Sequence, residues 1–445
     1  MENLQVSEDI QREGFLDRYF NLRKLNTNLR TEIIAGLTTF ITMSYIIIVN
    51  PNIIAQSGMP IGAVMVATIL ISALSSILMG LYANLPFGMA PGMGGNAFFA
   101  VTIVAGGLAT WQTALGMVFI AGVAFLILTL FGIREAIVNS IPKSLKISIG
   151  AAVGMFIALL GFSQSGIIVV NAQKSGLTLG DINSVNVLLS LIGVIVILGL
   201  MVRKVKVAIL IGIAIVTLLG IPFGITKVPH SLIQLPPNPS SIIFQVDWLS
   251  ALKLSFFPLM FSFFAGEFFS TLGTVLGVSG KAGLLDKNGN LPNIQKPFLV
   301  DSIATIGGGL MGVTTVATYV ESASGVEAGG RTGLTSISVG FFFLISLLLT
   351  PLFLMVPGIA TAPALIVIGL SMLSTLKELE YDKLDELAPA FIMLLITGFS
   401  NNLADGIVFG VLTYITTKLI AGKIKEIPIG LYFLAIPLVY YLTLA

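Results

Sequence analysis

The chain has 445 residues, of which 56% are hydrophobic and only 10% charged, whereas about a quarter of the residues in an ordinary soluble domain are charged. It has no cysteine and one histidine, His230, which argues against a thiolate or histidine-built metal centre and against a Ser/His/Asp triad. The net charge of +2 is too small to drive binding to nucleic acid, so the solvent that this composition fits is lipid. We expect an all-α polytopic membrane protein with no metal, no cofactor and no nucleic-acid partner.

The chain begins with a polar stretch, residues 1–30, that lacks the apolar region and small-residue cleavage site of a signal peptide. After it, apolar runs recur, each near the ~20 residues that cross a hydrocarbon core of ~30 Å. A further apolar run, 428–444, contains two prolines and could cross the membrane, re-enter it or lie on its surface. We place fourteen transmembrane spans at 33–53, 61–82, 84–108, 111–132, 146–162, 185–202, 207–225, 252–277, 298–312, 313–330, 333–356, 361–376, 386–400 and 403–421.

The positive charges predict the orientation, because Lys and Arg accumulate on the cytoplasmic side of a membrane. With the N-terminus inside, only Lys174, Lys227 and Lys253 of the 23 Lys and Arg residues fall outside. One miscounted span would move every later loop to the other side, so this distribution supports fourteen spans and a cytoplasmic N-terminus. We expect a plasma-membrane protein.

Two of the fourteen spans do not have the pattern of continuous helices. The segment 84–96, in span 3, contains two prolines and four glycines. The segment 313–325, in span 10, begins with a β-branched run that favours extended backbone. Non-helical backbone at this depth is tolerated only where it packs in protein or lines a cavity. The alternative is a pair of Gly/Pro kinks in packed helices.

The two interruptions lie at similar distances from the starts of the two halves of the chain. This predicts two inverted repeats of seven spans, 31–225 and 252–422, separated by an extracellular loop at 226–251 and followed by a C-terminal apolar segment at 423–445. Paired broken segments are the best sequence indication of the central site of a transporter.

A helix is expected to restart after each interruption. Asn96 precedes an apolar run and can act as an N-cap, while Ser324 and Glu327 fit the capping-box pattern S-x-x-E. The free N–H groups of the two half-helices would then carry partial positive charge at mid-membrane, which suits a neutral polar or an anionic ligand.

Acidic residues deep in a span are functional candidates, because they are costly unless they are paired, solvated or protonated. Glu321 lies at the second interruption, and Glu267 lies among phenylalanines in span 8. A structural interpretation of Glu267 is a carboxylate that hydrogen-bonds a neighbouring helix. For Asp301 and Asp405, which lie nearer the ends of spans, a capping or interfacial role is the better interpretation.

Five stretches of the chain carry the longest motifs: 36–45, 90–100, 281–285, 318–326 and 329–335. They resemble motifs of the adenine/guanine/hypoxanthine permeases, the azaguanine-type branch of the nucleobase-cation symporters. The resemblance runs from about Tyr19 to Gly422 and implies fourteen spans in a seven-plus-seven inverted fold. It further implies a core domain (spans 1–4 and 8–11) that moves against a gate domain (spans 5–7 and 12–14), and purine uptake coupled to protons.

The resemblance also implies a substrate site built from spans 1, 3, 8 and 10. By motif, Asn96 matches the substrate-site asparagine of span 3, and Glu321 the essential acid of span 10, with Tyr319 beside it. Thr39 lies in the span 1 motif.

Two positions depart from the family pattern. In span 8, Glu267 is a longer acid than usual, and Ser270 stands where a carboxylate is usual. In span 3, Gly95 stands where leucine usually precedes the asparagine.

The chemistry of a purine fits these residues. A planar, nearly neutral base needs aromatic faces and polar groups along its edge. Glu321 and Asn96 supply edge groups. Burial among aromatic rings favours the protonated carboxyl, so Glu267, and alternatively Glu321, can couple base binding to proton binding. The residues expected to offer faces are Phe98, Phe268 and Tyr319.

We therefore expect a secondary transporter that imports adenine, hypoxanthine or guanine by an elevator or rocking motion, with H⁺ as the coupling ion or alternatively Na⁺. An anion exchanger of the same seven-plus-seven architecture is the alternative, although two acids at the site would repel an anion. A membrane-embedded enzyme would need an Asp cluster for a metal or a nucleophile with its base, and the sequence offers neither. A homodimer is a possible assembly, because related folds often dimerise through the gate domain.

Overall fold

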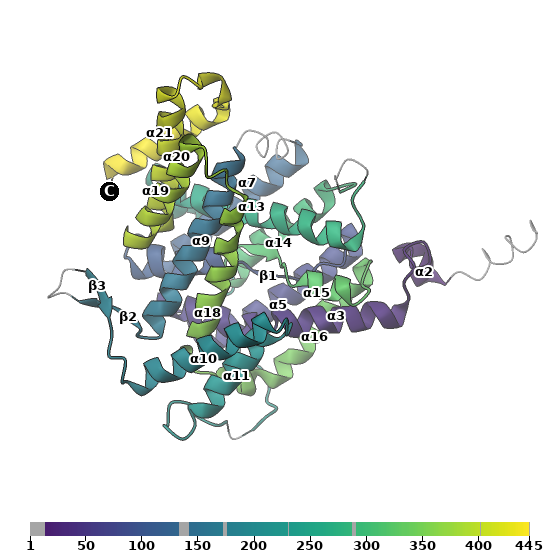
Figure 1. Ribbon diagram of the computed structural model, residues 1–445. Helices are drawn as coiled ribbons and strands as arrows, with labels where there is room; N and C mark the ends of the chain where they lie inside the picture. The colour runs from purple at the N-terminus through teal and green to yellow at the C-terminus, as the bar shows by residue number, and fades with distance from the viewer. Residues whose placement is uncertain are drawn as a thin grey trace, which may run out of the picture.

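The computed structural model describes residues 14–132, 142–171, 176–229, 231–286, 291–400 and 402–444. These residues are mostly helical, with two short sheets (Figure 1). Up to residue 220 the elements are α2 (Phe15–Phe20), α3 (Leu29–Met43), α4 (Ile46–Ile54), η1 (Ala55–Ser57), α5 (Ile61–Leu78), η2 (Met79–Ala83), β1 (Met89–Pro91), α6 (Met93–Ala97), η3 (Phe98–Ala105), α7 (Trp111–Leu130), α9 (Lys143–Gln164), β2 (Ile168–Asn171), β3 (Gly176–Leu179), α10 (Val185–Val202) and α11 (Ala208–Leu219).

The second half of the chain continues with α12 (Trp248–Ala251), η5 (Leu254–Phe256), α13 (Phe257–Ala282), α14 (Gln295–Met311), β4 (Val316–Thr318), α15 (Ser322–Glu327), α16 (Gly333–Ser346), η6 (Leu347–Leu349), α17 (Thr350–Leu354), α18 (Gly358–Leu373), η7 (Ser374–Glu378), α19 (Leu384–Ser400), α20 (Leu403–Ile420), η8 (Ile424–Glu426) and α21 (Ile429–Leu444). β2 and β3 form an antiparallel hairpin between α9 and α10, where the sequence predicted only a connection.

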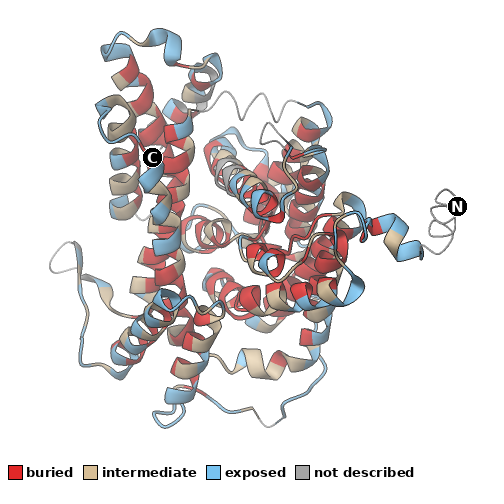
Figure 2. Ribbon diagram, turned by 45° about the vertical axis from the view of Figure 1, so that its right-hand side comes forward, coloured by how far each residue is buried: buried red, intermediate tan, exposed pale blue. Residues whose placement is uncertain are grey.

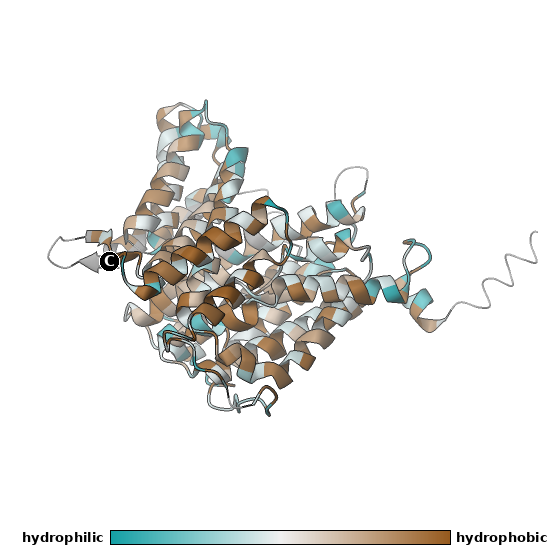
Figure 3. Ribbon diagram, turned by 60° about the horizontal axis from the view of Figure 1, so that its bottom comes forward, coloured by the Kyte–Doolittle hydropathy of each residue, from teal (hydrophilic) through white to brown (hydrophobic). Residues whose placement is uncertain are grey.

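Eight helical segments within the described residues are long and apolar enough to cross a membrane, and they match predicted spans 1, 2, 4, 5, 6, 11, 12 and 14. The other six predicted spans fall on helices that are shorter, interrupted or only partly described, so the count of fourteen stays a prediction. In two of the eight, Val185–Val202 and Gly333–Leu354, only 28% of the residues in the apolar 18-residue stretch are buried inside the protein. Figure 3 shows hydrophobic residues along the outward-facing helices and hydrophilic residues mainly in the loops, as expected for a protein in lipid.

The helices pack mainly in two groups. In one, α16 packs against α3 and α5, while α14 packs against α7 and α15 against α3. In the other, α9 packs against α18, α19 and α20, while α10 and α11 pack against α18. Buried residues concentrate along the inner helices of both groups (Figure 2). The groups meet where α9 contacts α6 and α13.

Glycines allow close helix approach within and between the groups. A Cβ on Gly369 of α18 would lie 2.4 Å from the carbonyl oxygen of Gly154 in α9, so these two helices pack backbone to backbone. A Cβ on Gly94 of α6 would lie 2.3 Å from a methyl group of Val153 in α9. The second contact lies between the two groups and beside the interruption in span 3.

Glu32, near the start of α3, caps the start of α16. Its fully buried carboxylate accepts hydrogen bonds from the backbone N–H groups of Arg331 (2.9 Å), Thr332 (3.2 Å) and Thr335 (3.2 Å). The N–H of Thr335 is a free donor in the first turn of α16, and the other two N–H groups lie directly before that turn. A carboxylate satisfies such donors well. The first and eleventh predicted spans therefore begin at the same face of the molecule, as the distribution of positive charge requires.

Candidate functional site

The two predicted interruptions lie side by side at the centre of the protein. β1 pairs with β4 in antiparallel register, with Met89 opposite Thr318 and Pro91 opposite Val316. Gly92 N–H donates to the Thr315 carbonyl (2.9 Å), and Tyr319 N–H to the Gly88 carbonyl (3.0 Å). This pairing satisfies backbone groups that could not be left open in a membrane. The predicted extended stretches in spans 3 and 10 are thus confirmed.

Helices restart after both strands, but the predicted caps are wrong. α6 begins at Met93 with Gly92 at the N-cap, so Asn96 lies inside the helix. α15 begins at Ser322 with Glu321 at the N-cap position. The hydroxyl of Ser324 instead contacts the Glu321 carbonyl (2.7 Å) and the Thr42 hydroxyl (2.8 Å), so it does not cap the helix. Each helix begins almost directly after its strand because the pairing of β1 with β4 ends there.

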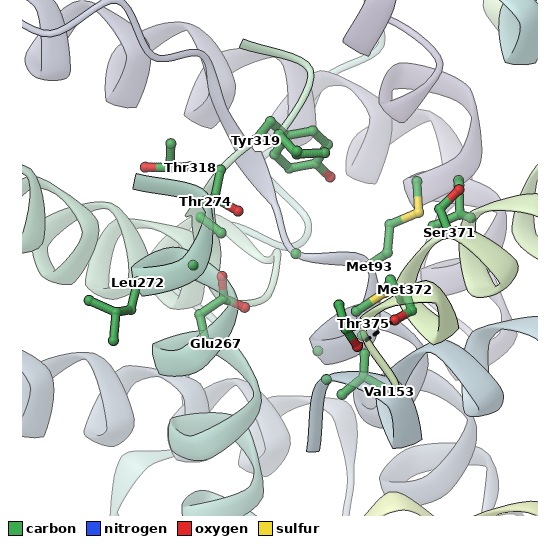
Figure 4. A pocket seen from close by; sticks show the side chains of 18 of the residues that line it. Met93, Val153, Glu267, Leu272, Thr274, Thr318, Tyr319, Ser371, Met372 and Thr375 are labelled. Carbon is green, nitrogen blue, oxygen red and sulfur yellow. Dashed lines mark hydrogen bonds between the residues drawn. The ribbon is translucent and has the colours of Figure 1, made fainter. Parts of the chain in front are cut away.

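A cavity of about 620 Å³ lies beside these helix starts, between the two groups of helices. This volume is within the usual range for sites that bind small molecules. Figure 4 shows Glu267 on one side of the cavity and Val153, Met372 and Thr375 on the other. Its apolar wall includes Met93, Phe98, Val153, Phe263 and Met372, and its polar groups include Tyr45, Glu267, Thr318, Glu321, Ser371 and Thr375.

Glu267 lines the cavity and is 5% exposed. Oε2 of its carboxylate accepts a hydrogen bond from the hydroxyl of Thr315, just before β4, at 2.7 Å. The structural interpretation from the sequence was a hydrogen bond to a neighbouring helix. The bond instead joins Glu267 to the non-helical segment before β4, and Glu267 also faces the cavity. A buried acid that faces a cavity is the arrangement expected of a group that binds a ligand or a proton.

Glu321 lines the same cavity from the start of α15. Its Oε1 accepts a hydrogen bond from the hydroxyl of Tyr45 at 2.6 Å. Tyr45 also lines the cavity, at the turn between α3 and α4 where span 1 is interrupted. Tyr45 was not among the predicted site residues, although it ends the motif 36–45.

Asn96 is fully buried but does not line the cavity among the described residues. Its Oδ1 accepts a short hydrogen bond from the hydroxyl of Thr314. Within the described part of the chain, its amide nitrogen has no hydrogen-bond partner. The structure thus places this amide behind the cavity wall, where it ties α6 to the segment before β4.

The three aromatic candidates differ in position. Phe98 lines the cavity and packs edge-on against Phe263, with ring centroids 5.1 Å apart. The ring of Tyr319 lines it too, while its hydroxyl donates to the Pro91 carbonyl (2.5 Å). Phe268 does not line it; its ring stacks on those of Phe264 and Phe125, away from the cavity.

The remaining candidates lie outside the cavity or outside the described part of the protein. Thr39 is buried against α15, where a Cβ on Gly325 would collide with its hydroxyl, and it is not part of the cavity wall. Ser270 lies on α13, but its side chain is outside the described residues. Asp301 is buried and accepts from the Thr271 hydroxyl (3.2 Å), and Asp405 lies in the first turn of α20. Asp405 thus lies where a role at a helix start was expected, whereas the expectation for Asp301 is wrong, because it lies inside α14 and bonds to α13 as a fully buried acid.

Two groups of membrane helices that enclose a cavity at the ends of interrupted helices define a membrane transport protein. Residues 30–411 match the model of the Permease family (Xan_ur_permease), and the chain belongs to this family. It is 40% identical over 415 residues to the adenine permease AdeP of Escherichia coli (93% of each chain). It is 39% identical to the guanine/hypoxanthine permease PbuO of Bacillus subtilis, covering 92% of this chain and 96% of that protein.

The fold is similar to that of the transmembrane domain of the cyanobacterial bicarbonate transporter BicA. The TM-score is 0.60 at 17% sequence identity, over 88% of this chain and 97% of that domain. At this identity the similarity concerns the fold alone.

Proposed function

We propose that this permease imports purine nucleobases, with adenine, hypoxanthine and guanine as the candidate substrates. The observation that carries the proposal is that Glu267 and Glu321 line one cavity together with aromatic rings. Carboxyl groups can accept from the ring N–H donors of a purine edge, and Phe98 or Tyr319 can cover its face. The similarity to the adenine permease AdeP and the guanine/hypoxanthine permease PbuO supports the same substrate class.

We propose further that the helices of spans 1–4 and 8–11 move as a core against a gate of spans 5–7 and 12–14, by an elevator or rocking motion. The packing of the helices in two groups, with the cavity between them, supports this division. The cavity reaches Lys143, Lys146 and Glu378, which the positive-charge distribution assigns to the cytoplasmic side. We therefore propose an orientation with the N-terminus in the cytoplasm of a plasma-membrane protein, in which this cavity would open inward.

Coupling to protons is part of the proposal. A carboxyl group between apolar side chains is costly to ionise, so a base that binds best to the neutral acid would enter together with a proton. Na⁺ is the alternative coupling ion. A homodimer formed through the gate spans is also proposed, and light scattering of the purified protein would measure its mass.

The test of function is uptake of radiolabelled adenine, guanine and hypoxanthine by cells that lack their own purine transporters. We expect uptake of at least one base above that of cells with the empty vector. Proteoliposomes with an imposed proton or sodium gradient then identify the coupling ion. Transport of sulfate or bicarbonate without any purine transport would favour the anion exchanger and contradict the proposal.

A further inference from the structure

Thr315 lies where three parts of the site meet. Its carbonyl oxygen accepts from the N–H of Gly92 at the start of α6 (2.9 Å), and its hydroxyl donates to Oε2 of Glu267 in α13 (2.7 Å). Thr315 itself is fully buried and directly precedes β4. One residue thus connects the strand of span 10 to the helix start of span 3 and to the acid of span 8.

Two glycines leave room for this connection. A Cβ on Gly95 would lie 2.6 Å from the hydroxyl oxygen of Thr315, while the next nearest neighbours are a Phe263 ring carbon at 3.8 Å and the Cβ of Thr315 at 3.9 Å. A Cβ on Gly92 would lie 2.5 Å from Oε2 of Glu267. A Cβ at either position would therefore push against the bonded pair. At Gly95, among the described residues and apart from the helix's own backbone, the hydroxyl oxygen is the one atom that would lie closer than 3.8 Å.

We propose that Thr315 is the positioning residue of Glu267, and that Gly95 is required because it gives the Thr315 hydroxyl its place. This inference rests on the proposed function. A glutamate side chain has several rotatable bonds, and a hydrogen bond to one carboxylate oxygen restricts its rotamers. With Oε2 held by Thr315, the carboxyl group meets a ligand in the cavity in one orientation, and less conformational entropy is lost on binding. Leucine usually stands at this position in the family that the sequence resembles. The close approach of the Thr315 hydroxyl gives a physical reason for the glycine at position 95.

The first test measures binding of radiolabelled adenine, guanine and hypoxanthine to the purified full chain. The best-bound base should bind about tenfold more weakly to Thr315→Val, since the buried carboxylate loses a donor. Thr315→Ser keeps the hydroxyl and should stay within about twofold of wild type. The matched control is Thr217→Val, which removes a buried hydroxyl whose bond runs within α11 to the Ile213 carbonyl, and it should bind like wild type.

The second test separates positioning from general disruption, and it remains decisive if Thr315→Val does not fold. Gly95→Ala should weaken binding severalfold in the wild-type chain. In a Thr315→Ala background the added methyl group meets no hydroxyl, so Gly95→Ala should cause no further loss. Melting temperatures of all variants establish that each protein is folded.

The outcomes distinguish the two proposals. A wild-type protein that binds none of the three bases would reject the proposed function and this inference with it. Wild-type binding together with unchanged binding by Thr315→Val would overturn the positioning role alone. So would an equal loss from Gly95→Ala in both backgrounds, or a loss in Thr315→Ser as large as in Thr315→Val.

Discussion

Tyr45 and Glu321 are 276 residues apart in the sequence, yet the hydroxyl of Tyr45 donates to Oε1 of Glu321 at 2.6 Å. The tyrosine follows the last residue of α3 by two positions, and the acid occupies the N-cap position of α15. The bond therefore joins interruptions in the first and the tenth predicted spans. It leaves both side chains in the wall of the same cavity, where a ligand can reach them.

Glu321 should bind the substrate directly. Glu321→Gln keeps the volume but replaces a carboxylate with an amide, so base affinity should fall by about 1.5 kcal/mol, or roughly tenfold. Tyr45→Phe is the matched variant, because it removes the donor and leaves the carboxylate, and its effect should be smaller. Equilibrium binding to purified variants is the measurement, and a wild-type affinity for Glu321→Gln would exclude Glu321 from the binding site.

Asn96 should matter for stability, through Thr314. Asn96→Ala leaves the buried Thr314 hydroxyl without its acceptor, which typically costs about 1–3 kcal/mol and should lower both the melting temperature and uptake. Adding Thr314→Val removes the second partner, so the double variant should be more stable than Asn96→Ala alone. If Asn96→Ala melted and transported like wild type, the bond between α6 and the segment before β4 would have no structural role.

The charge cluster around Lys418 should stabilise the predicted gate. Lys418 is 1% exposed, and its ammonium group contacts Asp385 (2.8 Å), Glu386 (2.5 Å) and Glu426 (2.8 Å). Removing one partner of a buried ion pair is strongly destabilising, and since Glu426 is half exposed we expect a loss of about 2–3 kcal/mol for Lys418→Ala. Lys383→Ala, which breaks only the exposed pair with Glu380, is the control and should melt like wild type.

The same cluster predicts an effect of pH on stability. The hydrogen bond from Lys418 holds the pKa of Glu426 below its usual value. A depressed pKa in the folded state means that the stabilisation is complete above the usual carboxyl range and is lost as the pH falls through the folded-state pKa. Wild type should therefore lose more stability than Glu426→Gln between neutral and acidic pH. Equal losses in a thermal melting series would contradict this role of Glu426.

The features that the sequence predicted well depend on local chemistry. Prolines and glycines at 84–96 and the β-branched run at 313–325 disfavour helix wherever they stand, so the two interruptions could be found without knowing the fold. The exact helix starts could not, because they depend on where β1 stops pairing with β4. Asn96 illustrates the same limit. Its Oδ1 accepts a hydrogen bond from Thr314, which lies 218 residues away, so its role could not be inferred from neighbouring residues.

The sequence itself argues against Phe268 as a residue of the same cavity as Glu267. Glu267 and Phe268 are neighbours on a helix, and adjacent helical residues do not share a face. If Glu267 faces the cavity, Phe268 points elsewhere, as its stack with Phe264 shows. Tyr45, by contrast, gave no local sign of its contact with Glu321, because that contact depends on how two distant spans pack.

Glu267 should carry the coupling proton, if protons drive uptake. It is buried and lines the cavity, whose apolar wall includes Phe98 and Phe263, so its ionisation is costly. Glu267→Gln mimics the protonated, neutral form of Glu267 and cannot lose a proton. The variant should therefore bind a base and exchange it across the membrane, yet lose accumulation driven by a pH gradient.

Proteoliposomes measure both properties in one preparation. Counterflow of labelled base without a gradient reports exchange, and accumulation with an inward proton gradient reports coupling. We expect exchange by Glu267→Gln within severalfold of wild type and accumulation at the level of equilibration. Thr217→Val serves again as the control that should do both, since its hydroxyl lies in α11 and bonds only within that helix among the described contacts. Gradient-driven accumulation by Glu267→Gln equal to that of wild type would assign the coupling role to Glu321, the other acid in the cavity wall.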